Sequence, residues 1–364
     1  MKYVVVGGGN IGTVLAAELK KLNVNDSVFI ETSDSKKWGS SIDIYNENDE
    51  FLYNVNDICI SQDIICDGDV YFFTLPKQVL KEKLNQHFQV ITNKHAVFVF
   101  VPGTGGVEYL LPKDSAYTFV GLQRTPYIAR IKEYGKKAYM LSKKDKIYFA
   151  TLGNQNNFDL EKIIGISCEK VHNFLEVTLT PSNPILHTSR LYTLFSSNDI
   201  MHQYDTNIMF YSEWSDNSSK CLLACDRELQ NIKKVLKNTD LSMVKSLLEH
   251  YGVSDVESAT KKIRSIKAFK NIESPMIKTN NGKYIVDLNS RYFREDFEFG
   301  LVIIKSVLQI CRLKTPSIDL ILAWYQDIFN KKIIKNGTLI IQDYMIVPQN
   351  AGITSIEELE RYYS

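Results

Sequence analysis

The sequence predicts an α/β N-terminal domain built on a doubly wound sheet, followed by a mainly α-helical C-terminal domain. Three observations support this prediction. An apolar run leads directly into a glycine-rich turn at residues 7–12, strand-like runs recur up to about residue 175, and helix-like segments dominate beyond it. A chain of 364 residues is long enough for two cores, so we expect one domain over residues 1–175 and another over residues 176–364.

The N-terminal elements follow one another closely. We expect a short buried strand over residues 2–6, a helix over residues 13–21, and a second strand over residues 27–30 that leads into Glu31. The turn between the first strand and the helix reads Gly7-Gly8-Gly9-Asn10-Ile11-Gly12. This order of strand, glycine turn, helix and strand, with an acidic residue nineteen positions after the last glycine, is typical of a Rossmann dinucleotide-binding domain.

The glycines of this turn have distinct physical roles in such a domain. Gly7 allows the tight bend, Gly9 lets the backbone approach a pyrophosphate, and Gly12 lets the helix pack closely on the strand. The helix N-terminus offers N–H groups to the anion. The residues expected to contact the cofactor are Gly7, Gly9, Asn10, Ile11, Gly12, Glu31, Thr32, Ser33, Leu75 and Pro76.

The segment after the second strand bears on the choice between NADH and NADPH. Glu31 would accept hydrogen bonds from a ribose diol and repel a 2′-phosphate, which favours NAD. Thr32, Ser33, Lys36 and Lys37 follow directly and could hold that phosphate if Glu31 turned away. The two lysines could equally be a solvated helix start, so both cofactors stay open, with NAD slightly favoured.

Two further strands are expected in the first domain. Residues 70–75 lead into Pro76, and residues 95–101 lead into Pro102-Gly103-Thr104-Gly105-Gly106. Ligands of doubly wound sheets bind beyond the carboxyl ends of the strands, so both turns are candidate loops on the nicotinamide side. Turns that only connect two elements, without binding a ligand, would have the same composition.

The remaining elements change in character along the chain. We expect a strand over residues 146–150 and strand or extended structure over residues 168–179. Helices are then expected over residues 189–196, 226–236, 241–251, 255–268, 300–311 and 317–329.

Composition and charge exclude several classes of function. The 43 basic and 42 acidic side chains give a net charge of +1, which argues against a nucleic-acid or membrane-surface partner. No window approaches a membrane span or a secretory signal, so we expect a cytoplasmic protein. The six cysteines show no metal-ligand spacing, so we expect reduced thiols and no metal site.

One histidine and one charged pair stand out in the second domain. His187 follows the helix opening Asn183-Pro184-Ile185-Leu186, and Arg291 and Asp296 lie five positions apart. An imidazole can take or give a proton near pH 7, and a guanidinium can grip a carboxylate. A lone histidine on an apolar helix is nevertheless more often structural, and Arg291 and Asp296 alone would be an ordinary charge cluster at a helix start.

Three motifs together resemble a known enzyme family. The run Arg124-Thr125-Pro126-Tyr127-Ile128-Ala129-Arg130-Ile131-Lys132-Glu133-Tyr134-Gly135, the run 183–187, and residues 291–296 with Gly300 are similar to the octopine/nopaline (opine) dehydrogenases. The resemblance implies an enzyme that joins the amine of an amino acid to a 2-oxo acid, with pyruvate expected, and reduces the imine with NADH or NADPH. It also implies a Rossmann domain, a helical domain, and substrates in the cleft between them.

The resemblance also implies roles for single residues. His187 matches the family's acid/base histidine, Asp296 its carboxylate partner, and Arg291 the arginine that holds a substrate carboxylate. Asn183 matches a polar position beside the nicotinamide or substrate. Arg124 departs from the smaller, uncharged residue expected there; if it enters the cleft and contacts substrate, it favours an acidic or neutral amino acid and disfavours arginine.

Two other functions stay open at this point. A 2-oxo acid reductase similar to ketopantoate reductase shares the two-domain plan and relies on a lysine. A nucleotide-binding protein without turnover would bind the cofactor only. The sequence also leaves a homodimer open.

Overall fold

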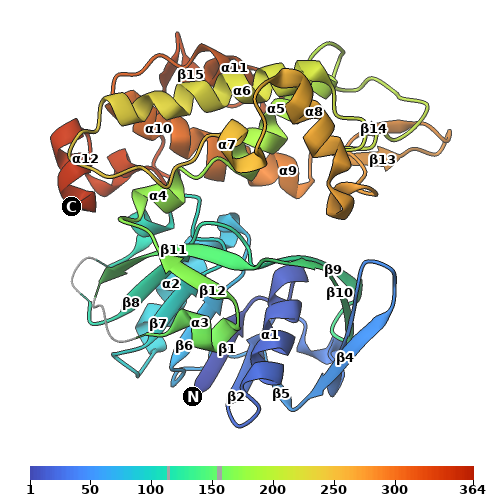
Figure 1. The fold of residues 1–364 in the computed structure, drawn as a ribbon, viewed down its shortest axis with the longest axis vertical. Helices are drawn as coiled ribbons and strands as arrows, with labels where there is room; N and C mark the ends of the chain where they lie inside the picture. The colour runs from blue at the N-terminus through green and yellow to red at the C-terminus, as the bar shows by residue number, and fades with distance from the viewer. Residues whose placement is uncertain (113–114, 154–157) are drawn as a thin grey trace. The chain divides into compact units, whose positions relative to one another are not determined.

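The computed structural model describes residues 1–112, 115–153 and 158–364, and these residues form two compact units. The first unit spans Met1–Val177 and the second Thr178–Ser364, a division close to residue 175, where the sequence changes character (Figure 1). Each unit has its own core and is described by itself.

An eight-stranded sheet forms the centre of the first unit. Its strands lie in the order β12-β11-β8-β7-β6-β1-β2-β5, and all neighbours pair in parallel except β8 and β11. The strands are β1 (Lys2–Val6), β2 (Ser27–Glu31), β5 (Ile58–Ser61), β6 (Val70–Phe73), β7 (Val97–Phe100), β8 (Thr118–Leu122), β11 (Lys146–Gly153) and β12 (Ser167–Lys170).

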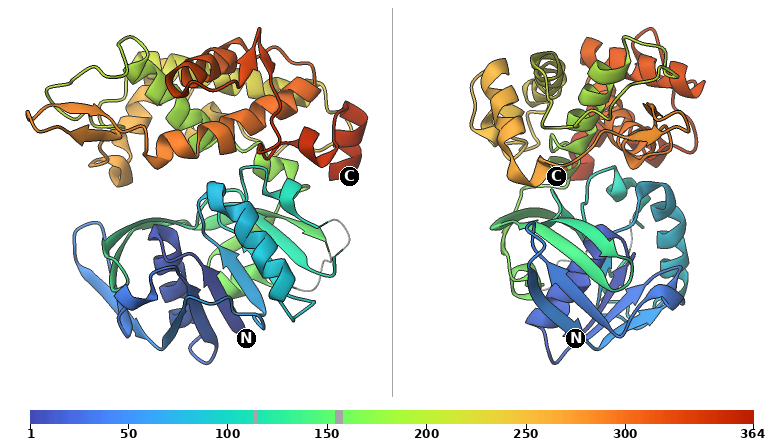
Figure 2. Two further views of the ribbon diagram at one scale, coloured as in Figure 1. Left: turned by 180° about the vertical axis from the view of Figure 1, so that it is seen from behind. Right: turned by 90° about the vertical axis from the view of Figure 1, so that its right-hand side faces the viewer.

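Helices cover both faces of this sheet, which confirms the doubly wound arrangement. On one face, α1 (Asn10–Leu22) and α3 (Leu160–Ile164) share a core with alternate strand residues such as Val28 and Ile30. On the other face, α2 (Lys77–Val90) packs its His87 and Phe88 rings on aromatic strand residues. Figure 2 shows α2 from behind, on the side of the sheet opposite α1.

A second sheet of four strands packs against α1 and was not expected from the sequence. Its order is β4-β3-β10-β9, and it contributes Ile42, Ile44, Ala129 and Ala138 to the α1 core. The central pairing joins two distant segments in parallel, so no local turn signal predicts it. The strands are β3 (Ser41–Tyr45), β4 (Phe51–Asn56), β9 (Tyr127–Glu133) and β10 (Lys137–Lys143).

The second unit is mainly helical, as predicted, with two small hairpins. Its helices after α4 (Leu175–Thr178), which lies at the division between the units, are α5 (Asn183–Phe195), α6 (Asp216–Gln230), α7 (Leu247–Tyr251), α8 (Val256–Ser265), α9 (Arg291–Arg294), α10 (Val302–Ile310), α11 (Pro316–Phe329) and α12 (Ile356–Tyr363). The hairpins pair β13 (Met276–Lys278) with β14 (Tyr284–Val286) and β15 (Ile334–Lys335) with β16 (Thr338–Leu339).

Three expected elements were placed wrongly. Residues 168–179 form the end of β12 and then α4 rather than one extended segment. The helix expected over 226–236 begins at Asp216, because the side chain of Ser215 caps it by accepting from the Ser218 N–H. The helix expected over 241–251 begins only at Leu247, behind a capping box of Ser246 and Glu249.

A wide helical turn precedes α10 and sets the position of Asp296. Phe297–Leu301 (η5) form a π-helical turn, in which the Leu301 N–H donates to the Asp296 carbonyl at 2.9 Å. Gly300 lies in this turn and packs on Pro184 at the start of α5; a Cβ atom on Gly300 would lie 2.7 Å from the Pro184 ring. Asp296 is thereby brought to the first turns of α5.

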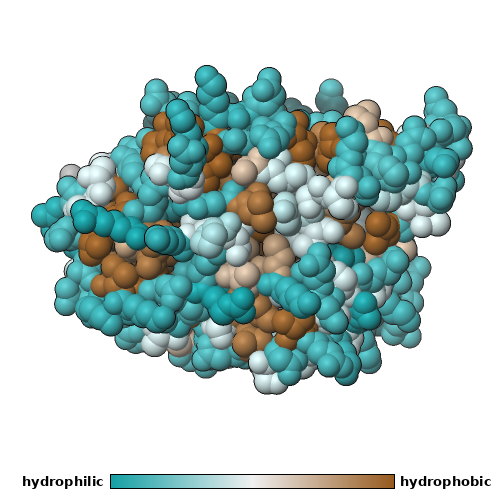
Figure 3. All heavy atoms as spheres, turned by 90° about the horizontal axis from the view of Figure 1, so that it is seen from above, coloured by the Kyte–Doolittle hydropathy of each residue, from teal (hydrophilic) through white to brown (hydrophobic). Residues whose placement is uncertain are grey.

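Figure 3 shows one face of the molecule, on which hydrophilic side chains predominate and apolar ones form separate patches. Within residues 1–112, 115–153 and 158–364, no helix is long and apolar enough to cross a bilayer.

Candidate functional site

His187 lies in the second turn of α5, between a carboxylate and a hydroxyl group. Its Nδ1 lies 2.8 Å from Oδ2 of Asp296, and its Nε2 lies 2.7 Å from the hydroxyl of Tyr211. The carboxylate accepts, so Nδ1 carries the proton of the neutral ring and Nε2 accepts from Tyr211. Such a ring can take a second proton on Nε2, because Asp296 stabilises the imidazolium that results.

The surroundings of His187 are aromatic and nearly closed to solvent. The residue is 7% exposed, and the rings of Tyr292, Phe210 and Tyr211 lie 4.5, 5.6 and 6.2 Å from its own, centre to centre. Electrostatic interactions are stronger in such a setting than in water. The charge of Asp296, whose side chain is 16% exposed, therefore acts on the ring with little screening.

Arg190, one turn after His187, holds the segment that presents Tyr211. Its guanidinium is buried and donates to the carbonyls of Phe210 at 2.9 Å and Glu213 at 2.8 Å, and to Oγ of Ser218 at 3.0 Å. Burial lowers the pKa of Arg190 to about 10. Carbonyl dipoles, rather than a carboxylate, satisfy this cation.

Sequence reasoning missed both Tyr211 and Arg190. The position of Arg190 three residues after His187 in a helix places both on neighbouring parts of one face, and this was the signal available. Tyr211 lies in the segment between α5 and α6, and no periodicity marks it.

The other predicted substrate residues of the second unit are more exposed. The Arg291 side chain is 68% exposed, and its Nε and Nη2 donate to the two carboxylate oxygens of Glu295 at 2.6 and 3.1 Å. Asn183 is the exposed first residue of α5. The structure thus brings Asp296 to His187, while the guanidinium of Arg291 is paired with Glu295.

The glycine turn of the first unit has the shape that a pyrophosphate needs. Gly7 has a φ of +113°, and a Cβ atom on Gly12 would lie 1.8 Å from the Gly7 carbonyl oxygen, so both positions require glycine. A Cβ atom on Gly9 would meet nothing within 4 Å, which leaves open space above the N-terminus of α1. Gly9 caps that helix without a side chain, so its first N–H groups face this space. The residues present therefore fit a dinucleotide.

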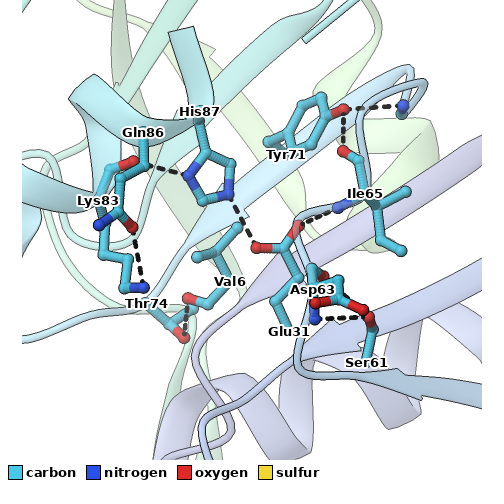
Figure 4. A network of polar contacts seen from close by, with 11 residues as sticks. Val6, Glu31, Ser61, Asp63, Ile65, Tyr71, Thr74, Lys83, Gln86 and His87 are labelled. Atoms are coloured by element: carbon cyan, nitrogen blue, oxygen red, sulfur yellow. Dashed lines mark hydrogen bonds and ion pairs between the residues drawn. The ribbon is translucent and has the colours of Figure 1, made fainter. Parts of the chain in front are cut away.

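Glu31, at the end of β2, is engaged within the protein (Figure 4). Its Oε2 lies 2.8 Å from Nε2 of His87, and its Oε1 accepts from the Ile65 N–H at 2.9 Å. Nδ1 of His87 donates to the Lys83 carbonyl at 2.7 Å. The expected ribose carboxylate is therefore already bonded on both oxygens.

The remaining predicted cofactor residues surround the glycine turn. Oδ1 of Asn10 accepts from the Ile131 N–H at 2.8 Å, which ties α1 to β9. Ile11 packs on the α1 core, Leu75 packs on Gly7, and Pro76 is the N-cap of α2. Thr32 is hydrogen-bonded through Oγ1 to the Tyr134 hydroxyl at 2.8 Å, and Ser33 is exposed.

Arg124 lies in the first unit, just after β8, and is half-buried. Burial lowers the pKa of Lys144, and the charge of Arg124 lowers it further. The charge of Arg124 therefore acts on Lys144 within this unit.

Comparison with known proteins gives consistent matches. Residues 170–329 match the model of the NAD/NADP octopine/nopaline dehydrogenase α-helical domain. The chain is 27% identical over 288 residues to tauropine dehydrogenase of Arabella iricolor, covering 72% of each chain. It is 25% identical over 319 residues to octopine dehydrogenase of Mizuhopecten yessoensis, covering 81% of this chain and 79% of that one.

The fold matches a solved structure over its whole length. The structure of octopine dehydrogenase in complex with NADH and agmatine superposes with a TM-score of 0.84 at 21% identity, covering 100% of this chain and 98% of that one. The helical-domain match over residues 170–329 and the relatives above support the octopine/nopaline (opine) dehydrogenase family, and the superposition shows that the chain has the fold of octopine dehydrogenase.

Proposed function

We propose that this chain is a nicotinamide-dependent opine dehydrogenase. It joins the amine of an amino acid to the carbonyl of a 2-oxo acid, expected to be pyruvate, and reduces the imine to an N-(1-carboxyalkyl) amino acid. The observation that supports this most is the buried His187 held between Asp296 and Tyr211 inside the segment that matches the family's helical domain.

The cofactor would be held by the glycine turn of the first unit. Gly9 and the N-terminus of α1 would receive the pyrophosphate through backbone N–H groups. A bound reduced nicotinamide supplies the hydride that the imine carbon receives. The family relatives whose structures are solved include complexes with NADH and with NADP+.

His187 would move the protons of the condensation. Nε2 of the neutral ring accepts a proton from the substrate ammonium, which frees the amine to attack the carbonyl carbon. The amine nitrogen passes one of its protons to the new alkoxide oxygen and the imidazolium returns the other, so this oxygen leaves as water and the protonated imine forms. Asp296 keeps Nδ1 protonated throughout, and the Tyr211 hydroxyl releases Nε2 when the substrate arrives.

Arg291 would hold the carboxylate of the oxo acid with the part of its guanidinium that is not hydrogen-bonded to Glu295. Glu295 takes the Nε–Nη2 edge, so the Nη1–Nη2 edge is the one oriented for a second carboxylate. Asn183 would contribute a polar contact, and Arg124 would favour an acidic or neutral amino acid over arginine.

The test follows NADH and NADPH absorbance with pyruvate plus each amino acid singly, in the wild type and in His187→Ala. His202→Ala is the matched control, because His202 is an exposed histidine of the same unit. Oxidation that requires both substrates, is lost in His187→Ala and survives in His202→Ala is the expected result.

Two other results would reject the proposal in different ways. Oxidation with the oxo acid alone would indicate a hydroxy-acid dehydrogenase of the ketopantoate-reductase type. Cofactor binding without turnover across the whole panel would indicate a nucleotide-binding protein.

A further inference from the structure

We propose that Glu31 does not read the adenosine ribose of the cofactor, and that Trp38 reads it instead, with Thr32 beside it. The inference rests on the proposed nicotinamide site and names the residues of that site that recognise the ribose. It reverses the role that the sequence alone assigns to Glu31, and it removes the main argument against NADPH.

Glu31 points to the face of the sheet that α2 covers. Val28 and Ile30 of β2 face the α1 core, so Glu31 faces the opposite side of the sheet, where α2 supplies His87. Glu31 is 7% exposed and His87 is 0% exposed (Figure 4). The carboxylate is therefore directed away from the α1 side of the strand.

The hydrogen bonds to His87 and Ile65 hold the carboxylate of Glu31 in this direction. The Lys83 carbonyl can only accept, so Nδ1 of His87 carries a proton, and one further proton lies between Nε2 and Oε2 of Glu31. The other oxygen is occupied by the Ile65 N–H. Turning Glu31 toward a ribose would leave His87 with an unpaired buried nitrogen, which is costly.

Trp38 and Thr32 lie beside the glycine turn, at Gly8. A Cβ atom on Gly8 would lie 2.5 Å from Cζ2 of Trp38, 3.3 Å from Cε2 of that indole and 3.2 Å from Oγ1 of Thr32. The Cζ2–Cε2 bond of the indole, next to the nitrogen, thus lies close to Gly8 of the glycine turn. Tyr134 supports this arrangement, with its ring 5.7 Å from that of Trp38 and its hydroxyl on Thr32.

The indole nitrogen is a donor that lacks an acceptor. Nε1 of Trp38 is buried and has no hydrogen-bond partner among the residues that the structure describes. Buried N–H groups without an acceptor are uncommon in folded proteins, and a bound ligand could supply the acceptor for this one. Beside a glycine turn after β1, at the end of β2, the acceptor is expected to be an oxygen of the adenosine ribose.

The test measures dissociation constants for NADH and NADPH by fluorescence titration, without any substrate. Glu31→Gln is the decisive variant, because the amide can accept from Ile65 and donate to Nε2 of a neutral His87, so every hydrogen bond survives and only the charge is lost. Trp38→Phe removes the donor and keeps an aromatic ring. Trp324→Phe is the control, a half-buried tryptophan of the other unit.

Glu31→Gln should change neither dissociation constant by more than about threefold, whereas Trp38→Phe should weaken both cofactors by roughly 5- to 10-fold, the effect of one hydrogen bond. Trp324→Phe should match the wild type. A loss of NADH affinity of about tenfold in Glu31→Gln, with a gain for NADPH, would show that Glu31 reads the ribose and would overturn the proposal.

A second measurement covers the case in which Trp38→Phe does not fold. The chain has 3 tryptophans, so the wild type gives three indole N–H signals in a ¹⁵N NMR spectrum, which Trp324→Phe and Trp214→Phe help to assign. ADP-ribose should shift the Trp38 signal most; no shift would reject its role. A wild type that binds neither cofactor would reject the nicotinamide site itself, whereas binding without turnover would reject only the proposed reaction.

Discussion

Each unit of this protein contains a buried histidine paired with a carboxylate at 2.8 Å, yet the two pairs differ in what the second ring nitrogen meets. In the first unit His87 donates to a backbone carbonyl, which can only accept. In the second unit His187 faces the hydroxyl of Tyr211, which can donate or accept.

The proposed proton transfer at His187 depends on this difference. The ring of His87 is held between two acceptors, the Glu31 carboxylate and the Lys83 carbonyl. The ring of His187 can exchange roles with Tyr211 and present Nε2 to a substrate. A carboxylate beside a histidine is therefore not enough to indicate catalysis; the partner of the other nitrogen carries the information.

The largest contrast should come from removing the charge of each carboxylate. Asp296→Asn should lower kcat by roughly 10²- to 10⁴-fold, because the amide no longer stabilises the imidazolium of His187. Cofactor dissociation constants should stay unchanged. Steady-state kinetics on Asp296→Asn and Glu31→Gln side by side would test this, and equal losses of kcat in the two variants would contradict the distinction between the pairs.

The next effect concerns stability and the first unit. His87→Leu should lower the free energy of unfolding by about 3–5 kcal/mol, because it leaves the carboxylate of Glu31 buried without its partner. The double variant with Glu31→Leu should recover most of that loss, since an apolar pair leaves no buried charge. Urea unfolding would measure both, and a double variant no more stable than the single one would show that the ion pair itself stabilises the fold.

A smaller loss is expected from the support of Tyr211. Arg190→Met should lower the free energy of unfolding by about 2–4 kcal/mol, because the carbonyls of Phe210 and Glu213 and the Ser218 hydroxyl lose their donor. It should also lower kcat, since Tyr211 lies in the segment held by these contacts. Arg190→Lys, which retains the charge, should be affected less; equal losses in the two variants would point to packing alone.

The smallest effect is expected from Tyr211→Phe, which tests the difference between the His87 and His187 pairs most directly. Tyr211→Phe removes the hydroxyl that meets Nε2 of His187 and should lower kcat by about 3- to 10-fold, the effect of one neutral hydrogen bond. The fold should not change, because the ring stays stacked 4.2 Å from that of Phe269. A loss as large as that of Asp296→Asn would show that the hydroxyl itself carries the proton.

The sequence predicted the parts of this molecule that local patterns determine. The glycine turn, the strands on either side of α1 and the helical second unit follow from short-range spacing. The sheet that packs on α1 does not, because β3 pairs with β10 across a long stretch of chain. Tyr211 was missed for the same reason, since only the folded chain brings it to His187.

Glu31 shows that the spacing of a motif does not by itself determine the direction of a side chain. Its distance from the last glycine matched a ribose ligand, but strand alternation had already assigned Val28 and Ile30 to the α1 side and Glu31 to the other. The alternation of side chains along β2, considered together with the spacing of the motif, would have predicted the direction of the carboxylate. It would not have predicted its partner His87.

Because of the π-helical turn at Phe297–Leu301, the number of residues in this segment matters as much as any side chain for the position of Asp296. It holds one more residue than a regular helical turn and lies between Asp296 and α10. Deleting a single residue within it would change the rotation between Asp296 and α10 by about 100° about the helix axis, and would turn Asp296 away from His187. A chain with every site residue intact would then lose the pair, so alignments of relatives should be inspected for gaps here before any substitution is interpreted.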